Sequence, residues 1–171
     1  MSDMIHAENL TFRYTDFSRA THLALDGVNL TIPYGQFTAI LGRNGSGKST
    51  FARMCNAINL PSGGRIWVDG MDTMDEEQLW DIRRACSMVF QNPDNQIVTD
   101  YVWHELAFGL ENMALPVQDI RRRVSEMASF FGMEEWFHKK TCQLSGGQKQ
   151  MLNLAAVMAM DPKLLILDEP T

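Results

Sequence analysis

The sequence has few cysteines and no long apolar run, and each shortage excludes a class of protein. Its three cysteines are widely spaced and form no Cys-x-x-Cys pair, which excludes a disulfide framework and a zinc knuckle. We expect all three thiols, Cys55, Cys86 and Cys142, to be buried and unreactive. Apolar stretches without charge, such as residues 152–160, are far shorter than the ~18 apolar residues that a membrane-spanning helix needs.

Basic residues are also scarce relative to acidic ones. The chain carries 15 Lys and Arg against 21 Asp and Glu, a net charge of −6 at pH 7. Because non-specific binding to nucleic acid requires basic side chains that neutralise phosphates, we expect no nucleic-acid partner. The single dense basic run, residues 121–123, is typical of the solvated face of a helix. The N-terminal segment has no basic start and no apolar core, so no signal peptide is visible.

The remaining composition, 45% apolar and 21% charged over 171 residues, is that of one globular domain. Short apolar runs predict strands, and apolar residues three and four apart predict helices. The expected strands are residues 5–12, 24–32 with a turn at Asp26-Gly27, 37–41, 65–68, 87–90 and 164–167. The expected helices follow the glycine-rich loop at 42–47 and cover 76–84, 102–110, 117–131 and 145–160. This mixture predicts an α/β fold in which 37–41 is a strand buried on both faces.

The glycine-rich loop carries the first chemical signal. Residues 42–49, GRNGSGKS, match the P-loop pattern G-x-x-x-x-G-K-[ST] at every fixed position. Glycines let successive N–H groups point into one concavity that holds phosphate oxygens, and the following helix adds its positive end. Lys48 can reach the β- and γ-phosphates, and the Ser49 hydroxyl can bind Mg²⁺. The expected nucleotide-binding residues, unless the loop is a simple turn, are Gly42, Asn44, Gly45, Ser46, Gly47, Lys48, Ser49 and Thr50.

An apolar run that ends in two acids supplies a second signal. Residues 164–167 read as a buried strand that delivers Asp168 and Glu169 to the carboxyl edge of a sheet, where α/β proteins bind ligands. Asp168 would hold Mg²⁺ in the Walker-B role, and Glu169 would polarise the attacking water. An acid pair at a strand end, taken alone, is equally typical of a solvent-facing turn.

A third motif opens the helix that leads to this strand. Residues 144–148, LSGGQ, join a hydroxyl and two glycines to a helix start, which makes a second candidate phosphate site. Two half-sites on one chain suggest that the halves meet across a dimer. The alternative is an ordinary N-capped helix, because Ser is a favoured cap. The candidate residues are Ser145, Gly146, Gly147 and Gln148.

Together these motifs resemble the nucleotide-binding domain of ABC-type ATPases over almost the whole chain, LSGGQ being that family's signature. The resemblance implies a P-loop NTPase fold with a RecA-like core, an N-terminal antiparallel β part and a helical subdomain. It assigns residues 1–91 and 145–171 to the core and 92–144 to the helical subdomain. It also implies that Tyr14 stacks on adenine and that Gln91 contacts Mg²⁺ or water. The alternatives are an edge-strand aromatic for Tyr14 and a polar loop residue for Gln91.

Two further stretches are more specific. Residues 91–98 and 107–112 resemble the ATPase subunits of energy-coupling factor importers, which take up vitamins and transition-metal ions, although Trp103-His104 departs from the acidic pattern of that group. The resemblance implies ATP hydrolysis with Mg²⁺ at the cytoplasmic face of the membrane. The implied partners are a second, identical or paralogous ATPase subunit, a transmembrane coupling subunit and a substrate-binding membrane subunit.

Several alternatives stay open beside this interpretation. The chain could serve another class of ABC importer, or could bind nucleotide with little turnover. A soluble ABC ATPase that acts on nucleic acid or ribosomes is disfavoured by the acidic charge and by the short interval between Lys48 and Ser145, which cannot hold a long coiled coil. The family domain also continues past Walker B. We therefore expect a C-terminally incomplete domain, whose D-loop and switch histidine lie downstream and which alone hydrolyses little ATP.

Overall fold

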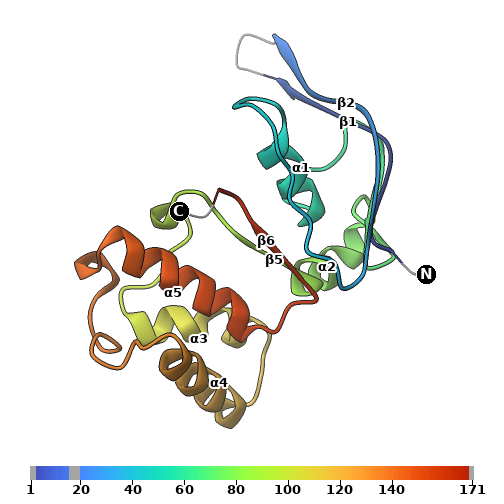
Figure 1. The fold of residues 1–171 in the computed structure, drawn as a ribbon. Helices are drawn as coiled ribbons and strands as arrows, with labels where there is room; N and C mark the ends of the chain where they lie inside the picture. Colours follow the sequence, from blue (N-terminus) through green and yellow to red (C-terminus); the bar gives the residue numbers. More distant parts are fainter. Residues whose placement is uncertain (1–2, 16–19, 170–171) are drawn as a thin grey trace. The chain divides into compact units, whose positions relative to one another are not determined.

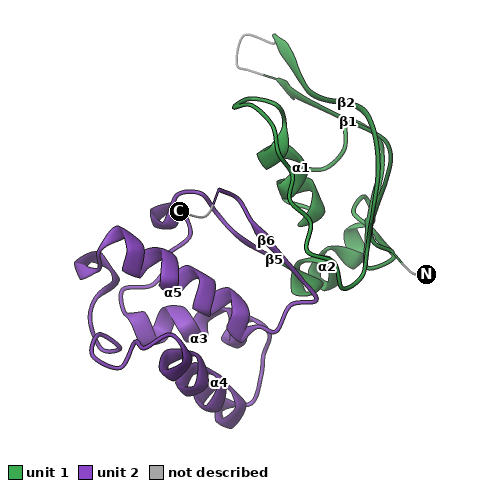
Figure 2. Ribbon diagram, in the orientation of Figure 1, with its two compact units in different colours: residues 1–87 green, residues 88–171 purple. Residues whose placement is uncertain are grey.

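The computed structural model describes residues 3–15 and 20–169, and the chain divides into two compact units, Met1–Ser87 and Met88–Thr171 (Figure 2). The expected division at residues 91/92 and 144/145 stays a prediction. Within the described residues, no helix is both long and apolar enough to cross a membrane.

The first unit is built on a four-stranded antiparallel sheet with the order β2-β1-β3-β4 (Figure 1). Strand β1 spans Asp3–Thr15, β2 Thr21–Pro33, β3 Gly63–Val68 and β4 Met71–Asp72. The two predicted N-terminal strands are confirmed and are longer than their apolar patterns suggested. The sheet supplies much of the core of this unit: Met4, Ile5, Ala7 and Leu10 of β1, Leu25 and Ile32 of β2, and Ile66 and Val68 of β3 are buried.

The expected turn at Asp26-Gly27 is wrong, because strand β2 continues through it. The pairing register runs from Leu10 opposite Val28 to Phe12 opposite Leu25, so β2 has one extra residue there and forms a bulge. Gly27 takes the left-handed backbone, with φ of 60°, that such a position requires. The Gly27 N–H donates to the Thr11 hydroxyl at 3.2 Å, which satisfies the backbone group that the bulge removes from the ladder.

The predicted strand at residues 37–41 is also wrong. The segment is irregular, and Phe37 and Leu41 are 97% and 90% exposed. A strand forms only where a neighbour completes its ladder of hydrogen bonds. Among the described residues the sheets consist of β1–β4 and of β5–β6, and neither includes this segment. An apolar run therefore gives the propensity for a strand without supplying its partner.

Two helices complete the first unit. Helix α1, Lys48–Cys55, follows the glycine-rich loop and buries Phe51 and Met54. Helix α2, Leu79–Ala85, follows the 3-10 turn Glu76–Gln78, in which the Glu77 N–H donates to the Asp75 side chain. The prediction of a helix at 76–84 is confirmed.

The second unit combines a two-stranded sheet with three helices. Strands β5, Cys86–Val89, and β6, Leu164–Leu167, are paired. The helices are α3, Val102–Asn112, α4, Val117–Phe130, and α5, Gly146–Ala159, with single turns at Pro93–Asn95 (η2) and Thr141–Gln143 (η3). The core between the helices is one apolar cluster, centred on Val102, Leu106, Leu110, Met133, Leu152 and Ala155.

The apolar stripe predicted along 117–131 is confirmed as α4, which ends before Gly132, but the basic run on the same helix is only partly a solvated face. Arg122 is exposed and pairs with Glu126 at 2.9 Å, as expected. Arg123 instead lies half-buried and donates to the carbonyl oxygen of Ala159 at 3.0 Å, at the end of α5. The run therefore contributes one helix-to-helix contact.

The cysteines divide in a way that the sequence did not predict. Cys55 and Cys86 are buried, and burial raises the pKa of the Cys55 thiol well above its usual value and that of Cys86 to about 12. Both thiols therefore stay protonated and unreactive at neutral pH. Cys142 is exposed in the turn before the signature motif, so the expectation of three buried thiols is wrong.

Candidate nucleotide-binding site

The glycine-rich loop has the backbone that a phosphate cradle requires. Gly45 and Gly47 have φ angles of 81° and 90°, a left-handed conformation that side-chain-bearing residues rarely adopt. The Ser46 N–H donates to the Arg43 carbonyl at 3.1 Å and tightens the turn, and α1 begins immediately after Gly47. Exposed N–H groups and the positive end of a helix therefore meet at one place.

Close packing also fixes Gly47. A Cβ atom at this position would lie 2.6 Å from the carbonyl oxygen of Ala24 and 2.8 Å from a methyl carbon of Leu25, both in β2. No side chain fits there without displacing the strand. The loop is thus held against β2, which places its concavity at a fixed point of the first unit.

Lys48 lies folded over this loop. Its Nζ donates to the carbonyl oxygens of Gly42 and Arg43, each at 3.1 Å. The ammonium is therefore held beside the concavity, within reach of a phosphate placed there. Ser49 follows it in the first turn of α1 and is half-buried, and Asn44 and Ser46 are exposed on the loop.

Tyr14 joins the same half of the predicted site. Its hydroxyl lies 3.2 Å from the hydroxyl of Thr50, in the first turn of α1, and accepts from the Asn59 side-chain amide at 3.4 Å. The ring packs edge-on against Phe12, with the ring centres 4.8 Å apart, and the residue is 40% exposed. Tyr14 therefore lies next to the first turn of α1, directly after the glycine-rich loop, and part of the residue is accessible to a ligand. Asn59 belongs to no motif, and no local sequence pattern pointed to it.

The acidic residues lie in the second unit with Gln91. Asp168 is buried, and its backbone N–H donates to the carbonyl of Val89 at 3.0 Å, which continues the β5–β6 pairing. The Gln91 side-chain amide donates to the Glu169 carboxylate at 2.6 Å. The structure therefore brings together two predicted site residues that are 78 positions apart in sequence.

The signature motif is a well-capped helix start with open backbone. The Ser145 hydroxyl accepts from the Gln148 N–H at 3.3 Å, and the Gln148 side chain accepts from the Ser145 N–H at 2.9 Å, forming a reciprocal capping box. Gly146 and Gly147 are exposed, and a Cβ at either would meet nothing within 4 Å. The capping interpretation is confirmed. The backbone of the two exposed glycines is accessible to a phosphate, so the interpretation as a phosphate site stays a prediction.

The loop between Gln91 and Gln96 is tied to its surroundings by residues of the stretch 91–98, whose contacts the sequence did not predict. Gln96 accepts from the Phe90 N–H at 3.0 Å and donates to the Met88 carbonyl at 3.3 Å. Asp94 pairs with Lys149, one residue past the signature, at 2.5 Å. Only tertiary contacts reveal these partners, since no local pattern links residues so far apart.

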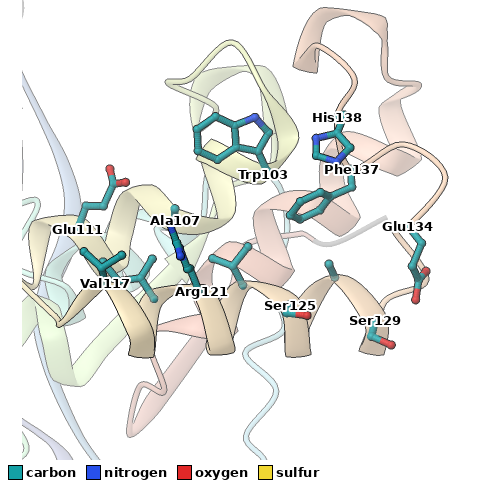
Figure 3. A pocket seen from close by; sticks show the side chains of 13 residues that line it. Trp103, Ala107, Glu111, Val117, Arg121, Ser125, Ser129, Glu134, Phe137 and His138 are labelled. Carbon is teal, nitrogen blue, oxygen red and sulfur yellow. The ribbon is translucent and has the colours of Figure 1, made fainter.

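A separate hollow of about 950 Å³ lies between α3, α4 and residues 134–138. Figure 3 shows Trp103 and Phe137 on one side of it and Arg121 and Ser125 of α4 on the other. The residues described as lining it include none of the predicted nucleotide-site residues. The hollow is therefore distinct from the candidate site.

The comparisons with known proteins come from sequence and structure. A family model described as ABC transporter matches residues 25–171. The energy-coupling factor transporter ATP-binding protein EcfA1 of Symbiobacterium thermophilum is 51% identical over 171 residues, covering 98% of this chain and 60% of the relative. The chain thus spans about 60% of the length of the curated relatives that it matches first.

Two solved structures have the same fold. The structure of cbiO1 from Clostridium perfringens, described as part of the ABC transporter complex cbiONQ, has a TM-score of 0.83 at 40% identity and is matched over 100% of this chain and 67% of its own. The ATP-binding cassette MJ0796, solved as a dimer with ADP and Pi, has a TM-score of 0.87 at 31% identity, over 98% of this chain and 75% of its own. With the mixed α/β fold of an ABC ATPase domain, the chain belongs to the ABC transporter family.

Proposed function

We propose that this chain is the ATP-binding and ATP-hydrolysing part of a subunit that powers a membrane importer of the energy-coupling factor type. The observation that carries the proposal is the 2.6 Å hydrogen bond between Gln91 and Glu169, which places an amide and a carboxylate together at the end of β6. The identity to EcfA1 proteins supports the importer class.

The first unit offers the groups that ATP requires. The exposed N–H groups of the loop at 42–47 bind phosphate oxygens, and Lys48 exchanges its two carbonyl contacts for phosphate oxygens. Tyr14 offers its ring to the adenine, with its hydroxyl fixed by Thr50. Residues 1–91 and 145–171 would then form the nucleotide-binding core and 92–144 the helical subdomain.

The side chains assigned to Mg²⁺ suit that ion by chemistry. Ser49, Gln91 and Asp168 provide hydroxyl, amide and carboxylate oxygens, the donor class that Mg²⁺ prefers. Asp168 is buried beside β5, so its carboxylate has few alternative positions. When bound, the ion would neutralise charge on the phosphates.

Glu169 is the residue assigned to the attacking water. Its backbone has a φ of 49°, in the left-handed region, and its carboxylate accepts from Gln91. The Gln91 amide orients the Glu169 carboxylate, which is the group assigned to accept a proton from the attacking water. In-line attack on the γ-phosphate then follows from positioning, as in other phosphoryl transfers.

A dimer completes the proposed site. Ser145 and Gly147 of one copy would cover the nucleotide held by the other copy, and the partner is either a second copy or a paralogue. Shifting the ratio of closed to open pairs from 1:99 to 99:1 requires that ATP bind the closed state more tightly than the open state by about 5.5 kcal/mol. The membrane partners would be a coupling subunit and a substrate-binding subunit that admits a vitamin or transition-metal ion, with this chain at the cytoplasmic face. That MJ0796 was solved as a dimer, and that cbiO1 is described as part of the ABC transporter complex cbiONQ, supports this arrangement.

Paired variants of the full-length protein test the function. Lys48→Ala should lose most binding of a fluorescent ATP analogue, because the ammonium is the main cation at the loop. Glu169→Gln should bind ATP normally and stall turnover, by about 10²-fold or more. Normal hydrolysis by Glu169→Gln would contradict the assigned role. Stimulation of ATPase activity by nucleic acid, with none from membrane partners, would contradict the importer proposal.

A further inference from the structure

The turn η2, which follows Gln91, is clamped onto helix α5 at two points. Asp94 and Lys149 form an ion pair with 2.5 Å between the carboxylate oxygen and Nζ. One turn further along α5, the Asn153 side-chain amide donates to the Pro93 carbonyl at 3.0 Å. Asn153 is 1% exposed and the Lys149 side chain 19% exposed, so the α5 side of both contacts is packed, whereas the Asp94 side chain is 64% exposed at the edge of the junction.

One end of this junction leads directly to the signature motif. The Lys149 N–H donates to the Ser145 carbonyl at 2.9 Å, so the lysine lies one helical turn from the serine that caps α5. A helix is stiff over one turn. Movement of Ser145 therefore moves Lys149, and with it the point at which Asp94 is held.

The other end leads to Glu169. Asp94 is anchored to its own loop because its N–H donates to the Asn92 side chain at 3.0 Å. The loop is fixed to β5 by Gln96 at one side and holds Gln91 against Glu169 at the other. Because Gln91 is only three residues before Asp94 in the same loop, a displacement of Asp94 also displaces Gln91.

We infer that the Asp94–Lys149 pair is a positioning contact that couples the signature end of α5 to the Gln91–Glu169 pair, so that the two ATP half-sites of one chain respond together. The inference rests on the proposed function, in which Ser145 contacts one nucleotide and Glu169 acts on another. An ion pair suits this role because it is directional, and its Lys149 end is packed although the Asp94 side chain is 64% exposed. The Asn153 contact keeps the loop in place when the pair is broken, so loss of coupling is separable from loss of fold.

The experiment compares the full-length protein, in its complex with membrane partners, with Asp94→Asn, Lys149→Met and the charge swap Asp94→Lys with Lys149→Asp. Each single variant should lower the Hill coefficient for ATP hydrolysis from above 1 to about 1, and kcat by about fivefold. ATP-driven dimerisation in a Glu169→Gln background, followed by light scattering, should lose its steep dependence on ATP concentration. The swap should restore both readouts, because the pair is rebuilt with reversed sign.

Glu126→Gln is the matched control, since it breaks the 2.9 Å ion pair with Arg122 on α4 in the same unit. It should leave the Hill coefficient unchanged. Single variants that keep the wild-type Hill coefficient, a swap that restores nothing, or a control that behaves like the test variants would each overturn the coupling. A wild-type complex that hydrolyses no ATP would instead contradict the proposed function, and the inference with it.

Discussion

At the scale of single residues, close contacts between backbone atoms determine which residue types fit at Gly64. Asn9 in β1 has a φ of 47°, and the β1–β3 register slips between Glu8 and Thr11, so the strand bulges toward its neighbour. Gly64 of β3 lies opposite this bulge with a φ of 71°. A Cβ atom there would be 2.2 Å from the Asn9 carbonyl oxygen and 2.4 Å from that of Glu8.

Gly64→Ala should therefore destabilise the protein severely, by about 3 kcal/mol or more, because both the left-handed backbone and the clash with main chain oppose it. The neighbouring Gly63→Ala is the matched control. Its Cβ would lie 3.6 Å from the Thr11 Cβ, an ordinary contact, so we expect a change within about 1 kcal/mol. Urea denaturation followed by circular dichroism measures both, and equal losses would contradict the bulge geometry.

At the scale of elements, the helices of the second unit are joined by polar contacts at their ends as well as by an apolar core. Glu105 of α3 is buried and accepts from the N–H groups of Val98 and Thr99, at 3.1 and 2.8 Å, which fixes the loop before the helix. Arg123 of α4 donates to the Ala159 carbonyl, where the negative end of the α5 dipole lies. The charge thus complements a helix end that would otherwise need another donor.

Arg123→Met should lower the free energy of unfolding by roughly 1–2 kcal/mol, the typical worth of a charged hydrogen bond to a half-buried carbonyl. Met keeps most of the apolar stem, so the loss reports the hydrogen bond. Arg122→Met on the same helix removes two exposed ion pairs, with Glu126 at 2.9 Å and with Asp119 at 3.9 Å, and should cost less than about 0.5 kcal/mol. Thermal unfolding by calorimetry distinguishes the two, and a larger loss for Arg122→Met would refute the assignment.

At the scale of the whole molecule, folding sorts chemically identical groups into different environments. Cys55 and Cys86 are buried, and Cys142 faces solvent. The desolvation that raises the pKa of the two buried thiols is a property of the folded chain and vanishes on unfolding.

The 171-residue chain should therefore show one fast thiol toward a disulfide reagent such as Ellman's reagent at pH 8 and three after unfolding in guanidinium chloride. Cys142→Ser should remove the fast phase and leave the folded chain almost unreactive. Two or more fast-reacting thiols in the folded wild-type chain would contradict the prediction that Cys142 alone is exposed.

Local sequence patterns predicted the helices well, because an apolar stripe or a cap is a property of neighbouring residues. The stripe of α4 and the Ser145 cap of α5 both follow from positions within one or two turns. The prediction of a strand at 37–41 was wrong because a strand needs a neighbouring strand to pair with, and local sequence does not determine that neighbour. The predicted turn at Asp26-Gly27 was wrong for a similar reason. A turn and a bulge can both contain a glycine with left-handed backbone, so the glycine alone does not distinguish them.

By itself, the sequence determined the family and the kinds of chemistry available: a glycine loop with Lys48, an acid pair at a strand end and a capped signature helix. The motifs encode these because phosphate binding needs particular residue types at fixed local spacing. Tertiary structure alone decided which distant residues meet. Gln91 reaches Glu169 and Asp94 reaches Lys149 because β5 pairs with β6 and η2 packs on α5, contacts between segments far apart in the chain that no local spacing specifies.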